Sequence, residues 1–89
     1  MIERELLVAN RLGLHARATA KLVQVLSAYK CNATLTAKGR EVNAKSIMGV
    51  MLLAAGQGTP VVLRIDGDDE AAAADAVAAL FERRFDEDA

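Results

Sequence analysis

The residues with the clearest potential for chemistry are His15, Arg17 and Ser46. His15 is the only histidine, and it lies between a glycine-containing loop, residues 10–14, and the predicted start of a helix. A helix start offers unpaired backbone N–H groups and a partial positive charge, which together attract phosphate. An imidazole with one unprotonated nitrogen is a competent nucleophile toward a phosphoryl group, and Arg17 can hydrogen-bond phosphate oxygens. The combination predicts that His15 is transiently phosphorylated.

Less specific roles for His15 and Arg17 also stay open. A lone histidine in a small domain is more often a surface or capping residue, and an isolated Arg17 is more often a solvated charge. Enzymatic phosphoryl transfer normally also needs a metal site or a nucleotide cradle, and the sequence contains neither a P-loop nor a metal-ligand pattern. We therefore expect no metal and no cofactor. If His15 handles phosphate, the donor and the acceptor must be other proteins.

Ser46 begins a short predicted helix over residues 46–53, where its hydroxyl is a natural N-cap. A phosphate added at such a helix start would be held well. The helix is so apolar that Ile47, Met48 and Met51 cannot all face the core, and flexible methionines suit a surface that meets several partners. The alternative is a helix that is buried nearly all round.

The elements that must position these residues follow from hydrophobic periodicity. Alternating apolar residues predict strands over residues 2–8, 32–37, 41–43 and 60–65. Three-to-four spacing predicts helices over 16–27, 46–53 and 68–85, with Val77, Leu80 or Phe81, and Phe85 on the buried face of the last, and residues 86–89 as a frayed tail. The order βαββαβα predicts an α+β domain with helices on one face of an antiparallel sheet. A ferredoxin-like sheet has the same element order, so the order of the strands stays open.

Length and composition exclude several classes of protein. The 89 residues suffice for one domain, residues 1–89, with 53% hydrophobic and 26% charged residues. The net charge is −1 and no basic stripe is present, which argues against a nucleic-acid partner. The N-terminus is charged from its third residue, and the longest apolar run, residues 47–55, is too short for a membrane span. We expect a cytoplasmic protein in which Cys31 is a small buried hydrophobe.

Two segments of the sequence resemble the HPr family of phosphocarrier proteins. Residues 10–20 read NRLGLHARATA and resemble the family's active-site segment; residues 43–51 read NAKSIMGVM and resemble its regulatory serine segment. Residues 56–59, GQGT, match the loop that follows. The likeness covers essentially the whole chain, and both segments at this spacing in a chain of this length are highly specific.

The resemblance implies a fold and a function. The fold is an open-faced sandwich, a four-stranded antiparallel sheet covered on one face by three helices. His15 would accept a phosphoryl group on Nδ1 from Enzyme I, which draws on phosphoenolpyruvate, and would donate it to IIA-type domains. Arg17 and Ala16 would bind the phosphate, and HPr kinase/phosphorylase would modify Ser46. Ala20 would join Ile47, Met48 and Met51 on the partner surface of a monomeric carrier that is not itself an enzyme.

One position departs from the resemblance. Many family members have proline where this chain has Ala18, and the alanine form is similar to proteobacterial members, some of which serve a nitrogen-related branch rather than sugar uptake. The pathway therefore stays open. Two other classes of function also stay open: a regulatory interaction module that works through Ser46 alone, and a small-ligand-binding domain unrelated to phosphate.

Overall fold

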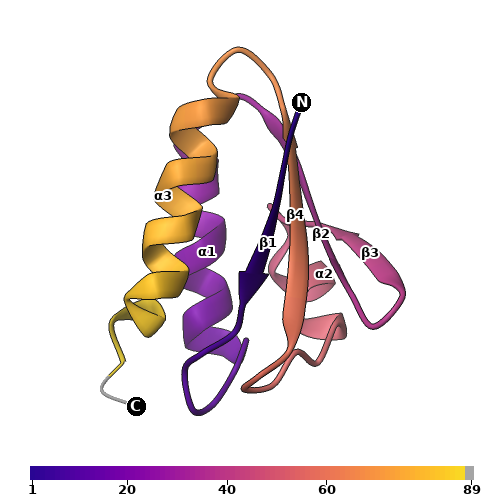
Figure 1. The fold of residues 1–89 in the computed structure, drawn as a ribbon, viewed down its shortest axis with the longest axis vertical. Helices are drawn as coiled ribbons and strands as arrows, with labels where there is room; N and C mark the ends of the chain where they lie inside the picture. The colour runs from indigo at the N-terminus through magenta and orange to yellow at the C-terminus, as the bar shows by residue number, and fades with distance from the viewer. Residues whose placement is uncertain (88–89) are drawn as a thin grey trace.

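Four antiparallel strands form one sheet in the computed structural model, which describes residues 1–87 (Figure 1). The strands are β1 (Ile2–Leu7), β2 (Asn32–Ala37), β3 (Arg40–Asn43) and β4 (Pro60–Asp66). Their order is β1-β4-β2-β3, with Ile2 opposite Ile65 and Leu35 opposite Leu63. The order places β4 and β2 in the centre, whereas a ferredoxin-like sheet has its first and third strands there. The predicted open-faced sandwich is confirmed.

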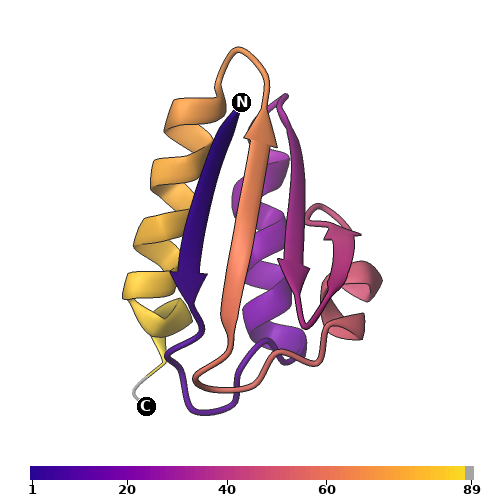
Figure 2. The same ribbon diagram turned by 45° about the vertical axis from the view of Figure 1, so that its right-hand side comes forward.

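The two faces of the sheet have different chemistry because successive side chains of a strand point to opposite sides. In β4, Val61, Leu63 and Ile65 are fully buried and alternate with more exposed residues. On the open face, Arg64 pairs with Glu3 at 2.6 Å. Figure 2 shows the strands running in front of α1, with the other two helices to either side. The core therefore lies between the sheet and the helices.

Three helices cover the buried face of the sheet: α1 (Ala16–Ser27), α2 (Ile47–Leu52) and α3 (Glu70–Glu82). Ala18, Leu22 and Leu26 form the fully buried stripe of α1, as three-to-four spacing predicts. The buried stripe of α3 begins with two alanines, whose small side chains let the helix lie close to its neighbours. The bounds of α1 agree with the prediction from the sequence.

The predicted end of the last helix is wrong. The α-helix stops at Glu82 rather than at Phe85, and Arg84, Phe85 and Asp86 have φ angles of 55°, 56° and 62° in a short 3₁₀ turn, η1 (Arg84–Asp86). Phe85 is nevertheless fully buried, with its ring centroid 4.9 Å from that of Phe81. Apolar spacing did not reveal the left-handed turn, because burial of Phe85 is expected whether or not the helix continues.

The prediction of a frayed tail over residues 86–89 is also wrong for the part that the structure describes. Asp86 belongs to η1, and Glu87 contacts His15; residues 88–89 lie outside the described part of the chain. Lys21 of α1 holds this segment by donating a hydrogen bond from Nζ to the carbonyl of Phe85 at 2.8 Å. Burial of Phe85 and this hydrogen bond explain why the segment follows a defined path.

Candidate functional site

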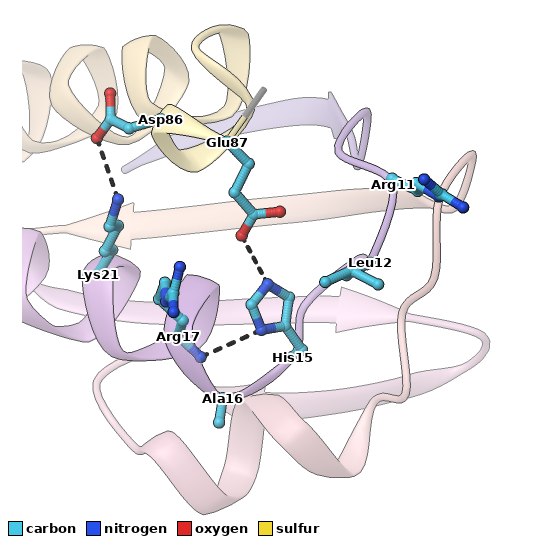
Figure 3. A pocket seen from close by; sticks show the side chains of 8 residues that line it. All are labelled: Arg11, Leu12, His15, Ala16, Arg17, Lys21, Asp86 and Glu87. Carbon is cyan, nitrogen blue, oxygen red and sulfur yellow. Dashed lines mark hydrogen bonds and ion pairs between the residues drawn. The ribbon is translucent and has the colours of Figure 1, made fainter. Parts of the chain in front are cut away.

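His15 is the N-cap residue of α1 (Figure 3). Its backbone is extended, with φ −75° and ψ −178°, and its carbonyl accepts the first helical hydrogen bond, from the N–H of Thr19 at 2.9 Å. The imidazole turns back toward the helix, so that Nδ1 accepts a hydrogen bond from the backbone N–H of Arg17 at 3.3 Å. Nδ1 is therefore the ring nitrogen whose lone pair faces the N–H groups of the helix start.

The loop before His15 is held in place by a close contact with the loop after α2. Gly13 has φ 69°, and a Cβ atom on it would lie 2.5 Å from the carbonyl oxygen of Ala55. Next to it, the N–H of Leu14 donates to that same carbonyl at 2.9 Å. Thr19 Oγ1 donates to the carbonyl of Leu14 at 3.1 Å. A glycine is required at position 13 both for its conformation and for space, and the contact sets where His15 begins the helix.

The second ring nitrogen of His15 contacts Glu87. Nε2 lies 2.6 Å from Oε2 of Glu87, and Oε1 of the same carboxylate accepts a hydrogen bond from Asn10 Nδ2 at 3.0 Å. Burial alone would raise the pKa of Glu87, but the hydrogen bonds from Asn10 and His15 and the nearby positive charge of Arg17 hold its pKa below the ordinary value. The carboxylate is therefore ionised near neutral pH and accepts a hydrogen bond from Nε2–H.

Sequence reasoning missed Glu87 as a site residue. Glu87 follows Phe85, the last large apolar residue of the sequence, by two positions, and a carboxylate there resembles any solvated charge. The signal that could have pointed to it is Phe85, because a phenylalanine buried so near the end anchors the residues that follow. The contact between Glu87 and His15 still depends on how α1 and α3 pack, which the spacing of apolar residues does not predict.

A pocket opens around His15, and Figure 3 shows the side chains that line it. Its cationic lining residues are Arg11, Arg17 and Lys21, and its acidic ones are Asp86 and Glu87. Lys21 is engaged with Asp86 at 3.5 Å. Within residues 1–87 the exposed guanidinium of Arg17 makes no hydrogen bond or ion pair. As far as residues 1–87 are concerned, the guanidinium is therefore available to an anion.

The pocket brings the predicted phosphate-binding residues together. Ala16 and Arg17 both line it beside His15, and both belong to the first turn of α1. The backbone N–H groups of this turn and the positive end of the helix dipole face the same space. An anion bound at Nδ1 would meet Arg17 through its backbone and through its side chain. The site residues themselves stay predictions, which the geometry supports.

Ser46 lies apart from the pocket, at the start of α2. Its hydroxyl oxygen accepts a hydrogen bond from the N–H of Gly49 at 3.1 Å, which is the geometry of an N-cap. Val50 is buried while Met48 is 79% exposed, so the helix is not buried all round. The predicted surface residues Ala20, Ile47, Met48 and Met51 are all exposed, and so are two apolar residues that sequence reasoning did not include, Leu12 and Leu52.

The relation between α2 and the site is visible in the packing. Helices α1 and α2 contact each other, and Figure 2 shows α2 beside the half of α1 that His15 begins. The apolar surface of α2 therefore lies on the same side of the molecule as the start of α1.

Two features that would signal other chemistry are not found in residues 1–87. No group of three His, Cys, Asp or Glu side chains is arranged to hold a metal ion. No helix of this part of the chain has the length and apolar character needed to cross a bilayer. Cys31 is buried directly before β2, near a strand start as predicted, and burial raises the pKa of its thiol.

Comparison with known proteins identifies the relatives of this chain. A family model described as the PTS HPr component phosphorylation site matches residues 2–83. The phosphocarrier protein HPr of Xylella fastidiosa is 67% identical over 88 residues, which cover 99% of each chain. A crystal structure of HPr-C-His from Thermoanaerobacter tengcongensis is 40% identical, with a TM-score of 0.96 over 100% of both chains. An HPr dimer from the same organism matches with 41% identity and a TM-score of 0.78 over 98% of this chain and 100% of that chain.

Proposed function

The chain belongs to the HPr family of phosphocarrier proteins of the phosphotransferase system, and from that premise we propose that His15 is the residue that carries the phosphoryl group. The observation that carries the proposal is the position of Nδ1, which accepts a hydrogen bond from the first turn of α1 inside an open pocket. Enzyme I is the proposed donor and IIA-type domains are the proposed acceptors.

The lone pair of Nδ1 attacks the phosphorus atom of the donor's phosphohistidine, and the bond from phosphorus to the donor nitrogen breaks. The N–H of Arg17, which Nδ1 releases, is then positioned to donate to a phosphoryl oxygen. The guanidinium of Arg17 offers a charge-assisted pair to the same group, and Ala16 contributes its backbone at the helix start. Donation to a IIA-type domain is the same step in reverse.

The proposal includes regulation through Ser46. A phosphate there would receive hydrogen bonds from the start of α2, so the fold should tolerate it. The same phosphate would add about −1.5 to −2 charges beside exposed Ile47, Met48 and Met51, which we propose to be, together with Ala20, the docking surface for partners. HPr kinase/phosphorylase is the proposed modifying enzyme. Docking would then require desolvation of the added charge, which costs affinity.

We also propose an oligomeric state and a cellular location for the protein. We expect a monomer in the cytoplasm, because a carrier must present one face to successive partners. The dimeric relative shows that this fold can also pair in a crystal. Analytical ultracentrifugation at the concentration of the transfer assay decides this point.

The relay itself tests the function. The protein is incubated with phosphoenolpyruvate and Enzyme I, separated from both, and then mixed with a IIA-type domain. The expected result is one acid-labile, base-stable phosphoryl group on the wild type, which then appears on the acceptor; His15→Ala should carry none. A folded wild type that takes up no phosphoryl group would favour a small-ligand-binding domain. If such a protein were instead modified on Ser46 by HPr kinase/phosphorylase in a separate incubation, the result would favour a purely regulatory module.

A further inference from the structure

The carboxylate of Glu87 is placed against His15 by a segment that the structure holds firmly. Oε2 lies 2.6 Å from Nε2, and the side chain of Glu87 is only 14% exposed. Glu87 lies beyond residues 2–83, which the family model matches, so family membership assigns it no role. The contact therefore comes from the C-terminal turn of this chain.

Three features give this turn its path. Residues 84–86 all have positive φ angles, a conformation that side-chain-bearing residues adopt only when the surroundings enforce it. Phe85 is fully buried, and its carbonyl accepts the hydrogen bond from Lys21. Asn10 holds the far oxygen of the Glu87 carboxylate and also donates from Nδ2 to the carbonyl of Gly13 at 2.8 Å. The carboxylate is thus tied to the loop that precedes His15.

We propose that Glu87 is a positioning residue for phosphoryl transfer, which keeps the proton of His15 on Nε2 and stabilises the charge that the ring gains when Nδ1 binds phosphorus. The proposal rests on the proposed role of His15. A carboxylate that accepts a hydrogen bond from one imidazole nitrogen sets the tautomer and leaves the lone pair on the other, as in carboxylate–histidine pairs of many active sites.

The bonding of the step explains why a carboxylate is useful at Nε2. When Nδ1 uses its lone pair to bond phosphorus while Nε2 keeps its proton, the ring acquires one formal positive charge. No proton has to move, because the electron pair of the broken bond stays on the donor nitrogen. A charge-assisted hydrogen bond is about twice as strong as a neutral one, so Glu87 favours the phosphorylated state over the free one. On donation, neutral imidazole with its Nε2–H is restored as the leaving group.

Glu87 does not occupy the position that the phosphoryl group needs. Its carboxylate contacts Nε2, whereas Nδ1 faces the N–H of Arg17. If Glu87 instead acted as an electrostatic barrier, its carboxylate would repel the incoming phosphoryl dianion and lower the phosphorylated fraction. The two roles predict opposite shifts, which makes them separable by one equilibrium measurement.

The measurement compares the wild type with Glu87→Gln and Glu87→Ala. Catalytic Enzyme I and a series of phosphoenolpyruvate-to-pyruvate ratios set the phosphorylation potential, and intact-protein mass spectrometry gives the phosphorylated fraction. Glu82→Gln is the matched control, because Glu82 is an exposed carboxylate at the end of α3. Circular dichroism verifies that every variant is folded.

We expect half-phosphorylation of Glu87→Gln and Glu87→Ala to require a ratio about tenfold higher than that of the wild type, as loss of a charge-assisted hydrogen bond implies, while Glu82→Gln matches the wild type. In proton NMR of the unphosphorylated protein, the Nε2–H resonance of His15 should be visible in the wild type and broadened by exchange with water in Glu87→Ala. A midpoint of Glu87→Gln that equals the wild type, or that moves to lower ratios, overturns the proposal. A folded wild type that is never phosphorylated refutes the function of His15, and the role of Glu87 falls with it.

Discussion

At the scale of single residues, Arg17 supplies two separate groups to the site. Its backbone N–H contacts Nδ1 of His15, whereas its guanidinium is exposed and unpaired within residues 1–87. Arg17→Ala removes only the guanidinium, and a hydrogen bond to a charged group contributes roughly 1.5–3 kcal/mol. We therefore expect transfer from Enzyme I to slow by about 10- to 100-fold with an unchanged circular dichroism spectrum.

The matched control is Arg11→Ala, which removes the same charge from the lining of the same pocket. Arg11 lies on the loop before His15 rather than in the first turn of α1, so its loss should slow transfer by less than about threefold, as expected for a screened charge. Stopped-flow or quench-flow transfer rates measure both variants. Equal effects of the two substitutions would show that Arg17 contributes only to the overall positive electrostatic potential of the pocket.

The hydroxyl of Ser46 caps α2, and we propose that it is also the site of regulation. Ser46→Ala should lose about 1 kcal/mol of stability in urea unfolding, because the N–H of Gly49 loses its acceptor. Ser46→Asp keeps an acceptor at the cap and adds a charge beside the exposed methionines. Its affinity for Enzyme I should fall by about tenfold or more while the fold is retained. Isothermal titration calorimetry on both variants checks this, and equal affinities would leave Ser46 as a helix cap alone.

At the scale of the elements, the start of α1 depends on the contact between two loops. Gly13→Ala places a Cβ against the carbonyl of Ala55 and forces alanine into the left-handed region, which should destabilise the protein by roughly 2–4 kcal/mol. Gly39→Ala is the control: Gly39 has φ 77° but open space around it, so only the cost of the conformation, about 1–2 kcal/mol, is expected. Chemical unfolding measures both, and equal losses would show that the loop contact is unimportant.

The elements differ in how much of them the sequence revealed. Periodicity located α1 correctly because Ala18, Leu22 and Leu26 bury one continuous stripe. The cap at Ser46 could be predicted because a hydroxyl residue directly before an apolar helical run is commonly a helix N-cap. The end of α3 was misplaced because a left-handed turn of non-glycine residues leaves no pattern in the sequence. The order β1-β4-β2-β3 was likewise hidden, since alternation shows which face is buried and not which strand lies beside which.

At the scale of the whole molecule, hydrogen-bonded carboxylates link distant segments and make stability depend on pH. Asp69, just before α3, accepts hydrogen bonds from the backbone N–H groups of Lys30 at 2.8 Å and Cys31 at 3.0 Å, next to β2. These hydrogen bonds, chiefly that from Lys30, hold the pKa of Asp69 below its ordinary value of 3.8. The pKa values of Asp86 and Glu87 are also lowered.

A carboxylate whose pKa is lower in the folded than in the unfolded protein stabilises the fold above its unfolded-state pKa, and the contribution is lost as the pH falls through the folded-state pKa. Stability in urea should therefore fall from about pH 5 to pH 3. Asp69→Asn, which cannot ionise, should show a smaller fall across this range. Exposed Asp68→Asn is the matched control and should follow the wild type; identical pH profiles for all three proteins would contradict the role of Asp69.

The local part of the candidate site could be predicted from the sequence, whereas its contact between distant residues could not. His15, Arg17 and the helix start are adjacent in the chain, so their chemistry could be predicted from local spacing. Glu87 is 72 residues away from His15. Its contact depends on the packing of α1 and α3 and on the turn that buries Phe85, which are properties of the folded molecule.

We propose that Nδ1 of His15 carries the phosphoryl group, and every other role in the site depends on this assignment. The most direct test is nitrogen and phosphorus NMR on protein labelled with ¹⁵N-histidine, phosphorylated with phosphoenolpyruvate and Enzyme I. Because His15 is the only histidine, a single ring reports the result. We expect phosphorus to couple to Nδ1 while Nε2 keeps its proton. Phosphorus on Nε2, or phosphate found only on a hydroxyl, would contradict it.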